Sequence, residues 1–172
     1  MKIKFTTSIL FLSLIVIFFI FYKGLKNSNI YTPNTSIEKN IPFFKGNIFN
    51  TQDEITSDAI FRKDQFYLIN IWSSWCVPCR EEHIFLINLS KKKDLKIIGL
   101  NYKDNIENAK FFLNELNSPY ELIISDLDGT IAIEWGAYGV PESFLVYNKK
   151  IIKKIIGPIT DQSFLEIKKL IQ

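Results

Sequence analysis

The hydrophobic and polar positions divide the chain into three parts. Between two pairs of lysines lies a run of 18 uncharged residues, 5–22, which is dominated by Ile, Leu and Phe. As a helix this run would span roughly 27 Å, close to the thickness of the hydrocarbon core of a bilayer. We therefore predict one N-terminal transmembrane helix that anchors the chain (residues 1–26), a polar linker (27–40) and a globular domain (41–172).

A cleaved signal peptide is the alternative for the first segment. Its exit, Phe21–Lys26, contains no small-residue cleavage site of the Ala-x-Ala type. Tyr22 and the flanking lysines are typical of residues that anchor a helix at the membrane interface. We therefore expect the segment to be retained. Two lysines on each side leave its orientation open, because the charges balance.

Apolar runs and helical spacings alternate along the globular domain. An entry strand or hairpin is predicted at 41–49, further strands at 66–72, 96–101 and 121–125, and a hairpin at 143–147 and 151–156. Helices are predicted after Cys76, after Asp104, which with Glu107 resembles a capping box, and after the cap Thr160. Strands that alternate with helices predict an α/β fold, with a central mixed sheet and helices on both of its faces.

Composition and charge narrow the classes of function. The 172 residues carry a net charge of +3 and the lysines are scattered, so we expect no nucleic acid partner. The 132 residues from Ile41 onward are enough for one self-sufficient hydrophobic core. The chain is therefore predicted to be a single folded domain with a membrane-binding appendage.

The only two cysteines, Cys76 and Cys79, lie where the predicted strand 66–72 passes into a helix. The free N–H groups and the positive dipole end of a helix stabilise a thiolate at its N-terminus. Such a position lowers the pKa of a cysteine from about 8.5 to roughly 3.5–7.5. The pattern predicts a thiol–disulfide redox site, with Cys76 as the exposed attacking thiol and Cys79, one turn further in, as the resolving thiol.

Three other uses of the cysteines are open at this point. A structural zinc site needs four ligands, and Cys76, Cys79 and the sole histidine, His83, supply at most three. Covalent haem attachment needs a histidine directly after the second cysteine, where this chain has Arg80. A static disulfide across so short a loop would constrain the unfolded chain little. We carry forward a reversible dithiol–disulfide pair, with His83 as a residue of the helix surface.

A second motif, at 122–130, is similar to the nucleophile motif of haloacid-dehalogenase-type phosphatases. In those enzymes an Asp after a hydrophobic strand attacks phosphorus, and an Asp two residues later is the acid and base. Here these positions are Asp126 and Asp128, but only 42 residues follow Thr130, too few for the further metal-binding acids. A turn at the end of a strand explains the Asp-Gly pair instead.

Four stretches resemble the thioredoxin superfamily, and within it the membrane-anchored thiol:disulfide interchange proteins of the DsbE/CcmG type. They are the single anchor, Trp-Cys-Val-Pro-Cys-Arg-Glu-Glu-His at 75–83, Gly-Leu-Asn-Tyr-Lys-Asp at 99–104 and Gly-Ala-Tyr-Gly-Val-Pro-Glu-Ser-Phe at 136–144. The resemblance covers the chain from Ile41 to its C-terminus. It implies a thioredoxin-like fold in which a cis Val140–Pro141 peptide lies against the Cys-x-x-Cys motif.

The resemblance also implies roles for side chains around the cysteines. The substrate groove would be lined by Trp75, Val140, Pro141 and Glu142. Glu82, three residues past Cys79 on the same helix face, would be a partly buried acid that moves protons for Cys79. The residues alone leave simpler roles open, a surface aromatic for Trp75 and a solvated helix acid for Glu82. We expect no metal ion and no other cofactor.

The function implied by the resemblance is reduction of the disulfide in the haem-binding motif of an apocytochrome c. The catalytic domain would lie in the periplasm, held to the inner membrane by its anchor, and a transmembrane thiol reductant would supply electrons. Two alternatives stand beside this prediction. One is a general periplasmic oxidoreductase with no preference for cytochromes, and the other is a redox-inert docking or chaperone module.

Overall fold

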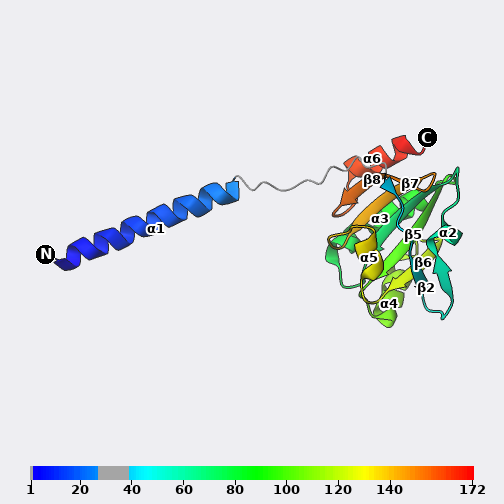
Figure 1. The fold of residues 1–172 in the computed structure, drawn as a ribbon, viewed down its shortest axis with the longest axis horizontal. Coiled ribbons are helices and arrows are strands. Elements are labelled where there is room, and N and C mark those ends of the chain that lie inside the picture. The colour runs from blue at the N-terminus through cyan, green and yellow to red at the C-terminus, as the bar shows by residue number, and fades with distance from the viewer. Residues whose placement is uncertain (1, 27–38) are drawn as a thin grey trace. The chain divides into compact units, whose positions relative to one another are not determined.

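The computed structural model describes residues 2–26 and 39–172, with side chains in 10–23 and 39–172. The chain divides into two units, Met1–Pro33 and Asn34–Gln172. The first contains one helix, α1 (Lys2–Lys26), and the second contains the remaining elements (Figure 1). In the part of the chain that the structure describes, no helix is both long and apolar enough to cross a membrane. The predicted anchor stays a prediction, and most of the predicted linker, 27–38, lies outside the described residues.

The second unit is built on one sheet of eight strands, in the order β1-β8-β7-β4-β5-β6-β2-β3. β4 pairs in parallel with β5, and β5 with β6, whereas β7 is antiparallel to both β4 and β8. The predicted mixed sheet is therefore confirmed. The strands are β1 (Lys39–Asn40), β2 (Lys45–Ile48), β3 (Glu54–Thr56), β4 (Phe66–Trp72), β5 (Leu95–Tyr102), β6 (Leu122–Asp126), β7 (Glu142–Tyr147) and β8 (Lys150–Ile156).

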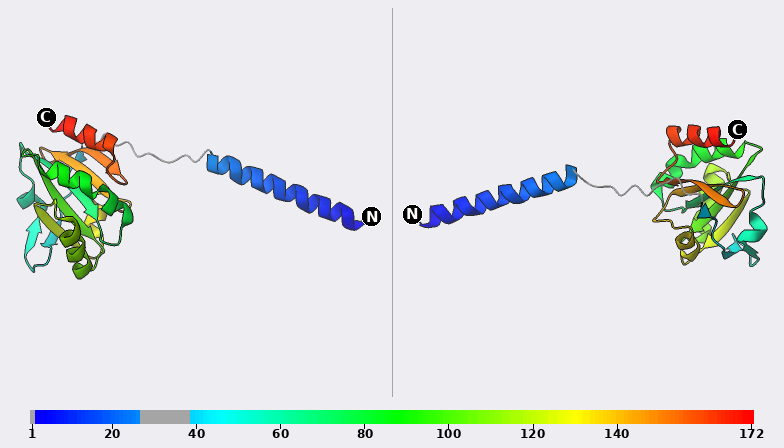
Figure 2. Two further views of the ribbon diagram at one scale, coloured as in Figure 1. Left: turned by 180° about the vertical axis from the view of Figure 1, so that it is seen from behind. Right: turned by 45° about the horizontal axis from the view of Figure 1, so that its top comes forward.

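Helices cover both faces of the sheet, as predicted. On one face, α3 and α6 lie side by side (Figure 2) and pack over a cluster that includes Leu68 of β4. Phe112 of α4 packs against Trp72 on the same face. On the other face, Ile69 and Ile71 of β4 belong to the cluster under α2 and α5. Since both faces of β4 are buried, the strand is apolar along its whole length except at Asn70. The helices are α2 (Ser57–Ile60), α3 (Val77–Ser90), α4 (Ile106–Leu116), α5 (Thr130–Glu134) and α6 (Asp161–Leu170).

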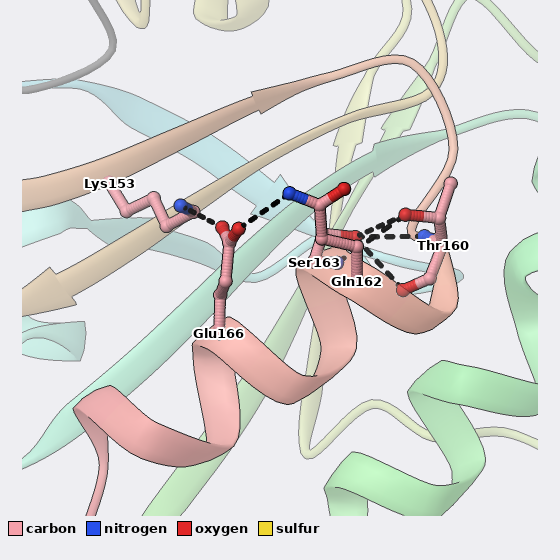
Figure 3. Close-up of polar contacts among 5 residues, drawn as sticks. All are labelled: Lys153, Thr160, Gln162, Ser163 and Glu166. Carbon is pink, nitrogen blue, oxygen red and sulfur yellow. Dashed lines mark hydrogen bonds and ion pairs between the residues drawn. The ribbon is translucent and has the colours of Figure 1, made fainter.

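The C-terminal hairpin and helix form as the sequence predicts. Asn148 and Lys149 turn the chain from β7 to β8 with φ of 51° and 60°, in the left-handed region that tight hairpin turns require. Thr160 caps α6 in a reciprocal capping box with Ser163 (Figure 3). Lys153 of β8 forms an ion pair with Glu166 of α6, which fastens this helix to the neighbouring strand.

The start of the domain differs from the prediction. Within 41–49 only Lys45–Ile48 forms a strand, and its hairpin partner β3 comes later in the chain. β1, two residues long, instead pairs with β8 at the opposite edge of the sheet. α2 and α5 were not predicted, because helices of four and five residues are too short to show a helical spacing of apolar positions.

Candidate active site

The turn between β4 and α3 is tied to the loop that follows β5. The Asp104 carboxylate accepts hydrogen bonds from the Ser74 backbone N–H and hydroxyl, both at 2.6 Å, and from the Asn101 amide at 2.9 Å. The Trp75 indole donates to the Lys103 carbonyl at 3.1 Å. These bonds join the end of one parallel strand to the end of the next, where α/β sheets place ligand chemistry. They fix the chain directly before the first cysteine.

Asp104 does not cap α4, contrary to the prediction. The cap is Asn105, whose side chain accepts the backbone N–H groups of Glu107 and Asn108. Since both Asp104 oxygens already accept hydrogen bonds around Ser74, the neighbouring residue takes the capping position. Asn and Asp are equally good at this position, so the sequence did not distinguish them.

Cys76 and Cys79 form a disulfide, with an S–S distance of 2.05 Å and a Cα–Cα distance of 5.3 Å. Cys76 is the N-cap of α3, and its sulfur accepts the Cys79 N–H at 3.2 Å. Pro78 follows in the first turn, where its missing N–H costs no hydrogen bond. The pair therefore lies at the positive end of a helix dipole, which favours a thiolate on reduction.

The prediction that Cys76 is exposed is wrong for this disulfide form. Cys76 is only 4% exposed and Cys79 is 1% exposed. Both belong to an apolar cluster with Trp72 and Phe112, and Val140 packs against the same cluster. The predicted roles of the two thiols, attacking for Cys76 and resolving for Cys79, stay predictions. The accessibility of the reduced Cys76 thiol remains a prediction.

The loop before β7 reaches the disulfide cluster through Val140. The Val140–Pro141 peptide is cis, as predicted. Val140 is half-buried and Pro141 is buried. Next to the cysteines in the sequence, the side chains of Trp75 and Val77 are exposed, and on the loop before β7 the side chain of Tyr138 is exposed. Three of the four predicted groove residues therefore lie near the disulfide: Trp75 directly precedes Cys76, and Val140 and Pro141 belong to the loop that reaches the disulfide cluster.

Glu142, the fourth predicted groove residue, does not face the groove. Its side chain is 2% exposed, and one oxygen accepts the Tyr138 and Gly139 N–H groups at 2.7 and 3.2 Å. The other oxygen pairs with Lys154 Nζ at 2.8 Å, and this ammonium also donates to the Gly136 carbonyl. Glu142 therefore supports the loop from inside, because a buried carboxylate needs such partners.

Glu82 is fully buried rather than partly buried, with 1% of its surface exposed. Its oxygens accept the Asn70 side-chain amide at 2.8 Å and the Ile159 N–H at 2.7 Å. Burial raises the pKa of Glu82 to about 7, against the opposing effect of these two hydrogen bonds. One turn past Cys79, the site therefore holds an acid that exchanges protons near neutral pH.

The prediction of a surface position for His83 is wrong. Its ring is 3% exposed and packs edge-on against Phe112, with centroids 5.2 Å apart. Nε2 lies 2.7 Å from the Asn117 carbonyl, so the neutral ring carries its hydrogen there. Burial, and to a lesser degree the charge of Arg80, lowers the pKa of His83 against the opposing bond to Asn117. His83 is a neutral core residue of α3.

The phosphatase-like motif closes a turn. Both oxygens of the buried Asp126 accept N–H groups, those of Ile131 and Ala132, at the start of α5. Gly129 adopts a φ of 82°, which favours glycine. Within residues whose side chains are described, no group of three or more His, Cys, Asp and Glu is placed to hold a metal ion. The carboxylate that would attack phosphorus is engaged in local structure.

Sequence reasoning missed two polar residues of the site. Asn70 lies in β4 and bonds to Glu82, and Tyr120 precedes β6 and donates to Asn70 at 2.8 Å. A signal for Asn70 was present, because an amide inside a strand buried on both faces must find hydrogen-bond partners. Tyr120 carried no comparable signal, since it follows Ser118-Pro119 at a predicted helix end.

A disulfide at the start of α3, beside a cis-proline loop and a buried acid, defines a thiol–disulfide oxidoreductase. The fold is thioredoxin-like. It matches the thioredoxin domain of a thiol-disulfide oxidoreductase from Bacteroides vulgatus with a TM-score of 0.65 and 20% identity, over 82% of this chain and 100% of that one.

The chain belongs to the Redoxin family, which it matches over residues 38–170, and is of the DsbE/CcmG type. It is 35% identical over 166 residues to the thiol:disulfide interchange protein DsbE of Yersinia pestis, covering 94% of this chain and 87% of that one. It is 45% identical over 117 residues to CycY of Rhizobium leguminosarum bv. viciae, over 67% of this chain and 62% of that relative.

Proposed function

We propose that this oxidoreductase reduces the disulfide of apocytochrome c haem-binding motifs in the periplasm during cytochrome c biogenesis. The observation that carries the proposal is the Cys76–Cys79 disulfide at the N-terminus of α3, one turn from the buried acid Glu82. A low-pKa first thiol and a nearby proton acceptor are what a dithiol needs to donate electrons to a disulfide. The similarity to DsbE and CycY proteins supports the assignment to this class.

The reaction begins with the reduced pair. The Cys76 thiolate attacks one sulfur of the substrate disulfide, forming a mixed disulfide, and the other substrate sulfur leaves as a thiolate. Cys79 then passes its proton to the Glu82 carboxylate, and the Cys79 thiolate attacks the sulfur of Cys76. The second substrate sulfur leaves and the Cys76–Cys79 disulfide forms. Two electrons pass to the substrate, whose two thiolates take up protons.

The surroundings of the disulfide suit an extended peptide. Trp75, Val77 and Tyr138 present apolar surface, and the loop ending at Val140–Pro141 lies beside the disulfide cluster. Glu142 and Lys154 hold that loop from within. The backbone of an extended substrate peptide could thus pair with the backbone of this loop while the substrate cysteine reaches the sulfur of Cys76.

The anchor and the electron donor belong to the same proposal. The 18 uncharged residues 5–22 support a helical span at the inner membrane, with the catalytic domain on the periplasmic side. Tethering would keep the domain close to a transmembrane thiol reductant, at an effective concentration of about the millimolar range for a short flexible linker. This donor would return the Cys76–Cys79 disulfide to the dithiol after each cycle.

Deletion of the gene, followed by haem staining of c-type cytochromes, tests the proposal. We expect staining to be lost, to return with the wild-type gene or with an added small dithiol reductant, and not to return with Cys76→Ser. The added reductant is informative because it replaces only the reducing step. Unchanged cytochromes together with altered thiols in many secreted proteins would instead support a general periplasmic oxidoreductase.

A further inference from the structure

Asn70 interrupts the apolar run of β4 with a fully buried side chain. Its amide nitrogen donates to Glu82 Oε1 at 2.8 Å and to the Ser143 hydroxyl at 3.0 Å, and its oxygen accepts the Tyr120 hydroxyl at 2.8 Å. Ser143 is its direct partner across the β4–β7 pairing. One side chain therefore links Glu82 of α3 to β7 and to the segment before β6.

Tyr120 determines which way the Asn70 amide faces. Its ring is stacked on Trp72 with centroids 5.5 Å apart, which fixes the hydroxyl in place. Burial, and then the charge of Glu82, raises the pKa of Tyr120 well above its usual value, so the hydroxyl keeps its proton. A hydroxyl that donates to the amide oxygen leaves the amide N–H groups to face Glu82 and Ser143.

The two oxygens of Glu82 both face N–H donors, one from Asn70 and one from Ile159. Such donors stabilise the charged carboxylate and oppose the effect of burial. A proton that arrives from Cys79 must therefore be accepted by a carboxylate whose hydrogen bonds favour its charged form. The Asn70 amide is the side-chain donor among these, so its orientation controls how strongly Glu82 holds a proton.

We propose that Asn70 is a positioning residue for Glu82, held by Tyr120, and that the two together set the pH range in which Glu82 exchanges a proton with Cys79. This inference rests on the proposed function of the site. Neither Asn70 nor Tyr120 is required to touch the substrate. Their effect is exerted on the acid alone.

Other ionisable groups near Glu82 leave this arrangement undisturbed. Glu142 precedes Ser143 in β7 and so points to the opposite face, where it pairs with Lys154 at 2.8 Å. The ring of His83 bonds to the Asn117 carbonyl. The side chain of Asn70 bonds to Glu82, Ser143 and Tyr120. The other titratable and charged groups on the elements around Glu82 are Cys79, Arg80, Glu81 and His83 of α3, Tyr67 of β4, Glu142 and Tyr147 of β7, Lys150, Lys153 and Lys154 of β8, and Asp161, Glu166, Lys168 and Lys169 of α6.

The test is a carbon-13 NMR titration of the Glu82 carboxyl in the full-length protein, oxidised and reduced. Asn70→Ala removes the donor, and we expect it to raise the Glu82 midpoint by about one pH unit. Tyr120→Phe keeps the ring and removes only the hydroxyl, so a smaller rise is expected. Tyr67→Phe is the matched control, because its buried hydroxyl also takes part in a hydrogen bond, with the Arg62 N–H, but not with Asn70.

A pH profile of disulfide exchange with a small disulfide substrate gives the second readout. We expect the part of the pH–rate profile that depends on the ionisation of Glu82 to move to higher pH in Asn70→Ala and Tyr120→Phe, by the shift seen in the titration. In Tyr67→Phe this part of the profile should not move. If both variants lower the melting temperature as Tyr67→Phe does and leave the Glu82 midpoint in place, their role is structural and the proposal is wrong. Because the titration needs no cytochrome, it stands independently of the biological substrate.

Discussion

Glu82 shows how one buried carboxyl combines catalysis with a cost in stability. Burial raises its pKa from 4.5 to about 7, and hydrogen bonds from Ile159 and Asn70 keep the rise from being larger. A pKa near neutrality suits a group that must take up and release a proton in every cycle. Between pH 4.5 and about 7 the folded protein binds more protons here than the unfolded chain does, so its stability falls as the pH rises.

Replacing Glu82 with Gln should remove this pH dependence. A rise in pKa from 4.5 to about 7 corresponds to about 3 kcal/mol, so the free energy of unfolding of Glu82→Gln, relative to the wild type, should increase by that order between these pH values and then level off. Urea unfolding of the oxidised proteins over a pH series measures it. Glu81→Gln, at the exposed neighbour, is the control. If the difference in the free energy of unfolding between wild type and Glu82→Gln stayed constant with pH, burial would not raise the pKa of Glu82 as described.

Single residues were predicted unevenly from the sequence. The roles of Cys76 and Cys79 followed from their place between a strand and a helix, which is local information. The burial of His83 depends on packing against Phe112 and on the Asn117 carbonyl, 34 residues away, which no local pattern encodes. The family resemblance implied a groove position for Glu142, but its partner Lys154 lies on the next strand and holds it inside the protein.

At the scale of elements, the loop before β7 depends on one buried ion pair. Glu142 accepts two backbone N–H groups of this loop, and Lys154 donates to the Gly136 carbonyl and lies 4.2 Å from the centroid of the Tyr138 ring. Both charges are removed from water, so each is costly without the other. The pair thus holds the loop that reaches the disulfide cluster.

Glu142→Gln should be strongly destabilising, because it leaves the Lys154 ammonium buried without its counter-charge. We expect a loss of about 3 kcal/mol or more. Glu54→Gln breaks the exposed ion pair with Lys45 and should cost less than about 1 kcal/mol. Urea unfolding of both variants at pH 7 makes the comparison. Adding Lys154→Met to Glu142→Gln should recover part of the lost stability. If Glu142→Gln and Glu54→Gln lost the same stability, the Glu142–Lys154 ion pair would have no special supporting role.

Elements with strong periodicity or turn chemistry were predicted well. β4, β5, β6, the β7–β8 hairpin, α3, α4 and α6 all lie where the sequence placed them, within a few residues. The alternation of apolar positions and the caps sufficed for these. β1, β3, α2 and α5 are each five residues or fewer, and their positions are set by pairing and packing with distant parts of the chain.

On the scale of the whole molecule, the proposed function needs both a redox domain and a membrane anchor. Asn34–Gln172 forms a unit of its own around the sheet and carries every residue of the proposed site. The proposed anchor changes only where the domain works, not its chemistry. A soluble fragment from Ile41 onward is therefore expected to keep the dithiol reaction and to lose the proximity to its electron donor.

The most direct test of the central claim is to trap the mixed disulfide. In Cys79→Ala the Cys76 thiolate can attack but the resulting bond has no internal group to break it, whereas Cys76→Ala should trap little because Cys79, inside the first turn of α3, is not the attacking thiol. Both variants are purified from membranes without reductant, and the proteins released by a reductant are identified. We predict an apocytochrome c, bonded through a haem-motif cysteine, or the transmembrane thiol reductant. A broad mixture of secreted proteins with neither of these would contradict the account.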